Sequence, residues 1–290
     1  MASHAASGHE VQGDIWSGGQ EPFKASYGKL YMWYFLLSDA FTFAGFLIAY
    51  GSLRFTMPTW PSPDFVFAAF PGLSGHWPLL FVTVMTFVLI ASSVTMVRAV
   101  QEGQEGNKRG VIFWMFLTIL GGAAFLGCQA FEWTTLIKGE NMSVTRNPFG
   151  RHVEDGTYTM NEHGEPYKAG EVAETFKAGD NYLIHGHEHV NTEGVAETQF
   201  TKRTYKTSGG ELGEQSFGPI AFGSLFFFIT GFHGFHVFSG VVFLTVIMIN
   251  VMSGLYHKRG NHYEMVEKIG LYWHFVDLVW VFVFLAFYLL

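Results

Sequence analysis

The chain has 290 residues, of which 49% are hydrophobic, 18% are aromatic and only 14% are charged. Soluble globular proteins average roughly 25% charged residues, so too few charges are present to cover this much apolar surface in water. A lipid bilayer is the solvent that suits such a composition. The net charge of −7 argues against a nucleic-acid partner, and the single cysteine, Cys128, excludes an intrachain disulfide or a multi-thiolate metal site.

Five apolar stretches are long enough to cross a bilayer, which needs about 20 residues of helix. They cover residues 30–53, 77–100, 111–137, 219–252 and 269–290. Each is expected to be helical, because an isolated strand leaves its backbone groups unsatisfied in lipid. The sequence therefore predicts an all-α integral membrane protein with a five-helix bundle. We expect a polar tail without the features of a secretion signal (1–27), three helices (28–137), a long loop (138–217) and two helices (218–290).

Basic residues in the short loops predict the orientation of these spans. Lys108 and Arg109 lie between the second and third spans, and Lys258 and Arg259 lie between the fourth and fifth. In a five-span chain both loops fall on the same side as the N-terminal tail. Because cytoplasmic loops carry an excess of basic residues, we expect a cytoplasmic N-terminus and a C-terminus outside the cytoplasm.

Residues 138–216 differ from the rest of the chain in composition. They hold 13 of the 24 acidic residues, 8 of the 17 basic residues and 5 of the 13 histidines. We predict a small extracytoplasmic lobe with some β-structure, including a hairpin turn at 161–165 after strand-forming residues 157–159, and further β-type residues at 201–207. A segment of this length is more than a connector, so we expect it to contact a partner.

Six ionisable side chains stand out within the predicted spans, because such groups are costly in lipid and usually face the bundle interior. They are Asp39, Glu132, His233, His236, His274 and Asp277. His233 and His236 in the fourth span are three residues apart, and so are His274 and Asp277 in the fifth. The two members of each pair therefore share a helix face. We expect a buried network between helices, with carboxylates accepting hydrogen bonds from imidazoles, and a close helix approach at Gly231 and Gly234.

Several interpretations of these residues remain open from chemistry alone. A haem would need axial ligands from opposite sides, for which His233 or His236 could face His274. Carboxylate and histidine groups can relay protons or ions, and they can also simply lock helices together.

The loop and the remaining residues add little catalytic chemistry. His185, His187 and His189 alternate, so in a strand they would share one face and form a weak candidate for a metal site. Cys128 is expected to be an inert small hydrophobe. We find no phosphate-binding loop or zinc-protease motif, and we predict no catalytic residues.

The two C-terminal spans resemble signature segments of subunit III of the haem–copper terminal oxidases, the cytochrome c oxidase family. These segments are Phe-Phe-Ile-Thr-Gly-Phe-His-Gly-Phe-His-Val at 227–237 and Tyr-Trp-His-Phe-Val-Asp-Leu-Val-Trp at 272–280. Ser-Asp at 38–39 and Gln-Ala-Phe-Glu at 129–132 also resemble family segments, and all five spans match in order. The chain departs from the family in having Asp39 where a Glu is usual, and in its long loop. It resembles five-helix bacterial members, without the first two of seven helices.

The resemblance implies an accessory subunit of a proton-translocating oxidase in a bacterial inner membrane. Such a subunit has no catalytic residues, haem or copper of its own; these cofactors lie in partner subunits. It packs against catalytic subunit I in a complex that includes subunit II, binds phospholipid in a cleft, and supports proton uptake. We then expect the buried polar side chains to hold the bundle together, with Asp39 facing subunit I or a lipid.

Other functions remain as alternatives. The chain could be subunit III of a quinol oxidase, which is the closer alternative, or a nitric-oxide-reductase-associated homologue. The lobe could serve in assembly by docking the oxidase to another respiratory complex or to a cytochrome domain, aided by its excess of acidic residues. The chain could also be an independent transporter or proton channel.

Overall fold

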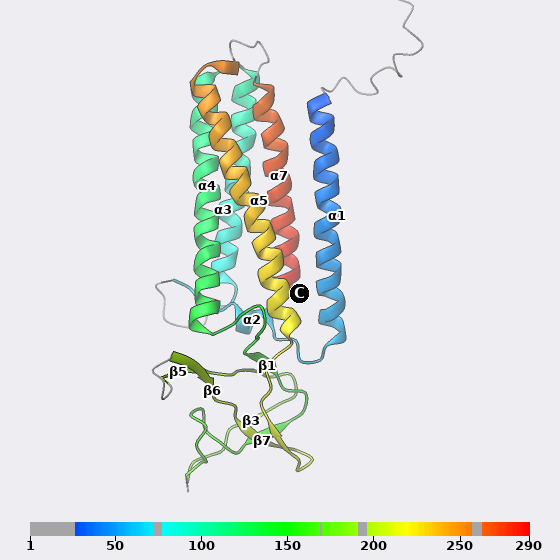
Figure 1. The fold of residues 1–290 in the computed structure, drawn as a ribbon, viewed down its shortest axis with the longest axis vertical. Coiled ribbons are helices and arrows are strands. Elements are labelled where there is room, and N and C mark those ends of the chain that lie inside the picture. Colours follow the sequence, from blue (N-terminus) through cyan, green and yellow to red (C-terminus); the bar gives the residue numbers. More distant parts are fainter. Residues whose placement is uncertain (1–26, 72–76, 169, 191–195, 257–262) are drawn as a thin grey trace, which may run out of the picture.

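The computed structural model describes residues 27–71, 77–168, 170–190, 196–256 and 263–290. Its long helices are α1 (Tyr27–Thr56), α3 (Leu80–Gln104), α4 (Lys108–Thr134), α5 (Ile220–Met252) and α7 (Glu264–Phe284), which stand side by side as an upright bundle (Figure 1). A short helix α2 (Pro63–Val66) precedes α3, and π-helical turns η1 (Thr135–Gly139) and η2 (Leu285–Leu289) extend α4 and α7. Within the described residues, five helices are long and apolar enough to cross a membrane, as predicted.

The helix bounds lie close to the predicted spans, and the differences have local causes. Helix α4 begins at Lys108, three residues early, because the Asn107 side chain caps it by accepting the Gly110 N–H at 3.3 Å. Helix α7 begins at Glu264, and its first turn carries two acidic residues that suit a helix N-terminus. The predicted tail up to residue 26, and Lys258 and Arg259, lie outside the described residues.

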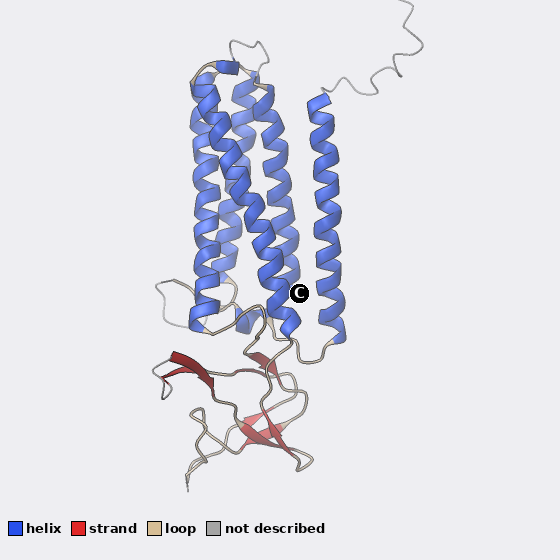
Figure 2. Ribbon diagram, in the orientation of Figure 1, coloured by secondary structure: helices blue, strands red, loops and turns tan. Residues whose placement is uncertain are grey.

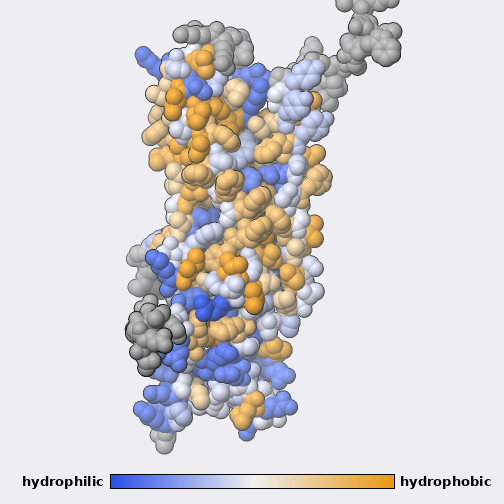
Figure 3. Space-filling view, in the orientation of Figure 1, coloured by the Kyte–Doolittle hydropathy of each residue, from blue (hydrophilic) through white to orange (hydrophobic). Residues whose placement is uncertain are grey.

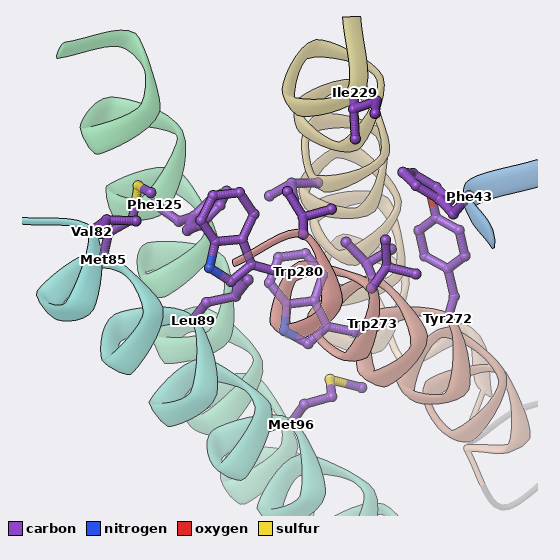
Figure 4. Packing of buried hydrophobic residues seen from close by; sticks show 14 of the residues in the cluster. Phe43, Val82, Met85, Leu89, Met96, Phe125, Ile229, Tyr272, Trp273 and Trp280 are labelled. Atoms are coloured by element: carbon purple, nitrogen blue, oxygen red, sulfur yellow. The ribbon is translucent and has the colours of Figure 1, made fainter. Parts of the chain in front are cut away.

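Two tryptophans of α7 occupy the centre of the bundle. Trp273 and Trp280 are buried among α3, α4 and α5 (Figure 4). The Trp273 ring packs against Gly122 of α4 and Gly240 of α5. A Cβ atom at Gly122 would lie 2.5 Å from its Cη2 atom, and one at Gly240 would lie 3.0 Å from its Cε3 atom. Because only glycine leaves room for the indole, these two positions set how closely α4 and α5 approach α7.

The outside of the bundle is also apolar. Helix α1 alone exposes Trp33, Phe41 and Ile48 among other large side chains. Figure 3 shows apolar residues along the visible face of the helices and hydrophilic residues gathered at the lobe end. A continuous apolar surface of this kind is typical of contact with lipid or with another membrane protein. Together with the five long helices, it indicates a multi-pass membrane protein.

The lobe lies between α4 and α5 in the sequence and covers one end of the bundle (Figure 2). Its strands are β1 (Phe149–Arg151), β2 (Gly156–Tyr158), β3 (Thr175–Phe176), β4 (Asn181–Leu183), β5 (Gly186–Val190), β6 (Ala196–Phe200), β7 (Thr204–Thr207) and β8 (Leu212–Glu214). All pairings are antiparallel, in sheets ordered β1-β4, β3-β2-β7-β8 and β5-β6. The predicted β-structure in this segment is confirmed.

The predicted hairpin is correct in its turn and wrong in its pairing. The Asn161 N–H donates to the Glu165 carbonyl at 2.8 Å, and Gly164 adopts a φ of +78°, which a turn glycine tolerates. Strand β2, however, pairs with β3 and β7, and only an isolated bridge joins Met160 to Pro166 after the turn. Proline lacks the N–H needed to continue a ladder, so the hairpin ends there.

A buried histidine organises the interior of the lobe. The His152 ring stacks on Phe176 with centroids 3.6 Å apart, and its Nε2 lies 2.7 Å from the Tyr158 hydroxyl. The Gln215 amide donates to the same hydroxyl at 2.9 Å, so the Tyr158 hydrogen is free to be donated to His152. Burial lowers the pKa of His152 to about 4, and burial raises the pKa of Tyr158 to about 12. Both groups are therefore neutral at pH 7.

Side-chain hydrogen bonds fix the lobe to the bundle. Asn181 of β4 accepts from the Ser62 N–H at 3.0 Å and donates to the Ser62 hydroxyl at 2.8 Å, which ties the lobe to the segment before α2. Asn147 donates to the Pro219 carbonyl at 3.1 Å, at the start of α5. The lobe is thus held in a defined position against the helix ends.

Candidate functional site: polar side chains between the helices

An ion pair joins α1 to α5. The Nε2 atom of His236 lies 2.8 Å from Oδ2 of Asp39, and both side chains are mostly buried. The His236 Nδ1 atom lies 2.8 Å from the Phe232 carbonyl, which only accepts, so Nδ1 carries a hydrogen. The Oδ2 atom of Asp39 is buried and makes no hydrogen bond among the described residues, so the contact between α1 and α5 rests on the close approach of the two groups.

This geometry corrects the expectation that Asp39 faces a lipid or a neighbouring subunit. The carboxyl group points to α5 because an unpaired charge in the bilayer is costly, and His236 is the partner within reach. A carboxyl group and an imidazole therefore meet between the helices, as Asp39 and His236, although Oδ2 of Asp39 makes no hydrogen bond among the described residues. Asp39, near the middle of α1, ties the helix to the bundle together with the Lys29–Glu267 ion pair at the start of the helix, at 2.8 Å.

The two histidines of α5 contact different helices. His233 is fully buried, and its Nε2 lies 3.1 Å from the Val276 carbonyl of α7. Its Nδ1 atom has no hydrogen-bond partner among the described residues. His233 and His236 therefore share a helix but tie α5 to α7 and α1, respectively.

Helices α3 and α7 are joined by hydroxyl groups. The Ser93 hydroxyl lies 2.6 Å from Nδ1 of His274. Trp273 donates to the Ser92 hydroxyl at 3.2 Å, and Trp280 donates to the Thr86 hydroxyl at 3.0 Å. Since His274 faces α3, it does not oppose His233 or His236 as the haem interpretation required. The hydroxyl partners Thr86, Ser92 and Ser93 were not identified from the sequence. Their spacing by about two helical turns within the second span is the signal that could have identified them.

Asp277 is placed beside the same α3 contacts. It lies one turn after His274 and interacts with Ser93, while its buried Oδ1 atom has no hydrogen-bond partner among the described residues. The predicted i, i+3 pair therefore shares a face, as expected, and turns that face to α3.

Glu132 is bonded to a tyrosine near the end of the chain. The Tyr288 hydroxyl lies 3.0 Å and 2.9 Å from the two Glu132 carboxyl oxygens, and both side chains are buried. Tyr288 belongs to η2, so this contact ties the end of α7 to α4. A tyrosine at the end of an apolar span would be expected at the membrane interface, and its inward direction is decided by packing against Phe67 and Phe226.

The two predicted helix-packing glycines differ. A Cβ atom at Gly231 would lie 3.0 Å from Cη2 of Trp133, so α4 approaches α5 closely there, as predicted. At Gly234 no heavy atom lies within 4 Å of the Cβ position, so the expected close contact is not found at that residue. A close contact of α5 with α7 occurs at Gly240, where a Cβ atom would lie 3.0 Å from the Trp273 ring.

The loop histidines are exposed. His187 and His189 belong to β5, and His185 lies just before it. Across the described part of the chain, no group of three or more His, Cys, Asp or Glu side chains is arranged to hold a metal ion.

Comparison with known proteins agrees with this architecture. The sequence pattern of the family described as cytochrome c oxidase subunit III matches residues 184–290. Cytochrome c oxidase subunit 3 of Gallus gallus is 26% identical over 263 residues, which is 88% of this chain and 66% of the relative. Quinol oxidase subunit 3 of Bacillus subtilis (strain 168) is 27% identical over 212 residues, which is 72% of this chain and 65% of the relative.

Shorter matches are more similar. Cytochrome c oxidase subunit 3 of Rhizopus stolonifer is 47% identical over 73 residues, a quarter of each chain. In each of these comparisons the match spans less than two thirds of the relative's own length. The family match and the relatives together support membership of the oxidase subunit III family.

Proposed function

We propose that the chain is the accessory subunit III of an aerobic respiratory haem–copper oxidase. In this role it carries no redox centre, packs against catalytic subunit I in a complex with subunit II, and supports the proton uptake and sustained turnover of subunit I. The observation that carries the proposal is the C-terminal family match at 184–290, which contains α5 and α7 with His233, His236, His274 and Asp277. These side chains contact neighbouring helices of the same chain, which suits a supporting subunit.

Two apolar hollows beside α1 support the proposed binding of phospholipid. One of about 200 Å³ lies between α1 and α7 and is bordered by Ala40, Ala44 and Leu278. The other, of about 370 Å³, lies between α1, α5 and α7 and is lined by apolar side chains together with Asn250 and Lys268. The first suits an acyl chain, and the second suits a chain whose anionic headgroup lies near the Lys268 ammonium.

Purification of the complex tests this function. A tag on the full chain should recover haem- and copper-containing subunits from solubilised membranes, with haem bands in the visible spectrum. The tagged chain separated from the complex should lose those bands. Recovery of the chain alone from mildly solubilised membranes, with no haem protein, would contradict the proposal.

Cytochrome c is the proposed electron donor, and a quinol is the alternative. The alternative is favoured by the Bacillus relative named quinol oxidase subunit 3. Oxygen consumption by the purified complex with reduced cytochrome c, compared with a reduced quinol, distinguishes the two. A copper-binding subunit II in the same preparation would agree with cytochrome c as the donor.

A docking role for the lobe is the second candidate function. It is favoured by the Asn181–Ser62 hydrogen bonds, which hold the lobe in a fixed position as a docking surface requires. The occupant would be another respiratory complex or a cytochrome domain. Removing residues 153–206 and finding every partner still co-purifying would exclude this role.

We infer further that the protein resides in a bacterial inner membrane, with its N-terminus in the cytoplasm and the lobe outside. Protease treatment of intact spheroplasts should cleave the lobe, whereas protection of the lobe would reverse the orientation. An independent proton channel predicts ion flux in liposomes that contain only this chain, and the absence of flux would leave the subunit role.

A further inference from the structure

A cavity between the helix ends and the lobe is left unexplained by a purely supporting role. It has a volume of about 200 Å³ and lies where α2, α3 and α4 meet η1, β1 and β4. Its polar lining includes the side chains of Glu132, Thr135 and Glu140, and its rim includes the exposed Ala69. The rest of the lining is apolar, so the two carboxyl groups and the hydroxyl supply the polar partners for water in a cavity whose volume admits several water molecules.

Glu132 has unused hydrogen-bonding capacity in the wall of this cavity. The side chain is 7% exposed, and both of its oxygens lie within 3.0 Å of the same Tyr288 hydroxyl. That hydroxyl has one hydrogen, whereas a carboxylate accepts about four hydrogen bonds. The remaining acceptor sites of the Glu132 carboxyl group can therefore be filled by water from the cavity or by a proton.

The backbone around this carboxyl group is also unusual. Helix α4 changes to the π-helical turn η1 at Thr135, three residues after Glu132, and Tyr288 lies within the second π-helical turn, η2. Isolated π-helical turns occur frequently at functional sites, because the extra residue redirects side chains within a helix. Here one π-helical turn follows Glu132 at the cavity, and the other carries its hydrogen-bond partner Tyr288.

Two further buried polar groups extend from Glu132 into the bundle. Gln129 lies three residues before Glu132 on the same face of α4, is 6% exposed, and has no hydrogen-bond partner for either amide atom among the described residues. The Trp133 N–H of α4 donates to the Thr230 hydroxyl of α5 at 3.3 Å. Because the two helices are antiparallel, one turn further into the bundle His233 of α5 lies at about the same height as Gln129 of α4. The Nδ1 atom of His233 is likewise buried and unpartnered within the described structure.

We propose that Glu132 exchanges a proton with water through this cavity, and that Gln129 and His233 hold ordered water that continues the hydrogen-bonded path inward. In the exchange, the Glu132 carboxylic acid gives its proton to a cavity water and becomes a carboxylate, which the Tyr288 hydroxyl stabilises by donation. Uptake is the reverse step, so protons and charge balance. The site goes beyond support of a neighbouring subunit, because it makes the lobe end of this chain a proton-binding surface of its own.

Several other titratable groups surround Glu132. Tyr288 approaches from η2, Tyr50 of α1 interacts with Tyr288, and Cys128 interacts with Glu132 from one turn earlier on α4. Glu140 follows η1 at the cavity rim and interacts with His185 of the lobe. Burial raises the pKa of Glu140, so this second carboxyl group must be separated from Glu132 in any titration.

Infrared spectroscopy of the full chain, purified from membranes, tests the proposal. The C=O stretch of a protonated carboxyl group should appear as the pH is lowered, should be lost in Glu132→Gln, and should persist in the matched variant Glu140→Gln. In heavy water this band should shift within the mixing time of the experiment. A band identical in wild type and Glu132→Gln at every pH, or one that resists exchange, would overturn the proposal.

Blocking the cavity tests the route. Ala68→Leu places a larger side chain in the cavity lining without changing Glu132, and should slow deuterium exchange of the carboxyl band at least tenfold. Ala69→Leu at the rim is a second blocking variant if the first fails to assemble. Unchanged exchange in a folded blocked variant would exclude this cavity as the route. These readouts concern Glu132 alone, so they are independent of whether the chain co-purifies with an oxidase.

The inner part of the path has its own test. A high-resolution cryo-EM map of the purified protein should show ordered water within hydrogen-bonding distance of the Gln129 amide and of His233 Nδ1. Dry packing around both groups, in a map that resolves waters elsewhere, would restrict the site to Glu132 and contradict the inward extension.

Discussion

The Nε2 atom of His236 lies 2.8 Å from Oδ2 of Asp39, and this contact joins the outermost helix, α1, to α5 in the membrane-spanning part of the chain. Much of the surface of α1 is exposed, so a polar contact within its span carries unusual weight. Loss of one member leaves the other buried without its partner, which costs about 1–3 kcal/mol.

Replacing either member of this pair should therefore loosen α1. We expect Asp39→Ala and His236→Ala each to lower the thermal unfolding temperature of the purified protein and to reduce its recovery with the oxidase complex. The matched control Ser38→Ala changes an exposed neighbour on the same helix. Unfolding temperatures and subunit content equal to those of wild type would show that the pair does not hold α1.

The two glycines around Trp273 should resist even small enlargement. A methyl group at Gly122 would meet Cη2 of Trp273 at 2.5 Å, and Gly122→Ala should destabilise the bundle by about 1–3 kcal/mol through overpacking. Gly45→Ala on α1 is the control, because nothing lies within 4 Å of its Cβ position. Denaturant titration followed by tryptophan fluorescence measures the difference, and equal effects at both sites would refute the packing argument.

The lobe should lose stability as the pH falls. Burial lowers the pKa of His152 to about 4, below the unfolded value of about 6.5, so the unfolded lobe binds a proton more readily than the folded lobe. The stabilisation of the folded lobe by neutral His152 is fully present above pH 6.5. It is lost progressively towards pH 4, to a limit of about 3 kcal/mol. Hydrogen exchange of β2 and β3 as a function of pH measures this loss.

A substitution isolates this effect. His152→Phe keeps an aromatic ring against Phe176 but removes the titrating group, so the pH dependence between 6.5 and 4 should flatten. His163→Gln changes an exposed histidine and should leave it unchanged. The same pH profile in His152→Phe and wild type would assign the acid sensitivity to other groups.

The link between lobe and bundle should depend on one asparagine. Asn181→Ala removes both hydrogen bonds to Ser62, and we expect about 1–2 kcal/mol less local stability, since each such bond contributes about 1 kcal/mol. Faster hydrogen exchange in β1 and β4, with no change in the helices, is the expected result. Ser208→Ala, at an exposed side chain of the lobe, is the control. Unaltered exchange in β1 and β4 would mean that other contacts hold the lobe.

Much of the fold could be predicted because hydrophobicity acts locally along the chain. Each of the five helices carries enough consecutive apolar residues to span a bilayer, and a helix satisfies its own backbone there. The β-structure of the lobe was predicted in kind, but the partners of β2 were not. Its contacts with β3 and β7 join residues about 20 and 50 positions apart, and strand pattern alone does not specify such partners.

The candidate site was predicted in part. The six ionisable residues that stand out in the spans lie between helices, as their cost in lipid requires, but their partners depend on how the helices are rotated. Asp39 was expected to face outward and instead meets His236, while Tyr288 was overlooked because a tyrosine at the end of a span resembles an interfacial residue.

Composition and hydropathy along the chain were enough to predict a membrane protein, its five membrane-spanning helices and the costly groups that those helices bury. The pairing of Asp39 with His236, the contact of His274 with Ser93, and the contact of Glu132 with Tyr288 beside a cavity emerge only when the helices are packed together. The reason is physical: insertion into lipid depends on the apolar content of each segment alone, whereas hydrogen-bond partners depend on the packing of side chains such as Trp273 against glycines of other helices.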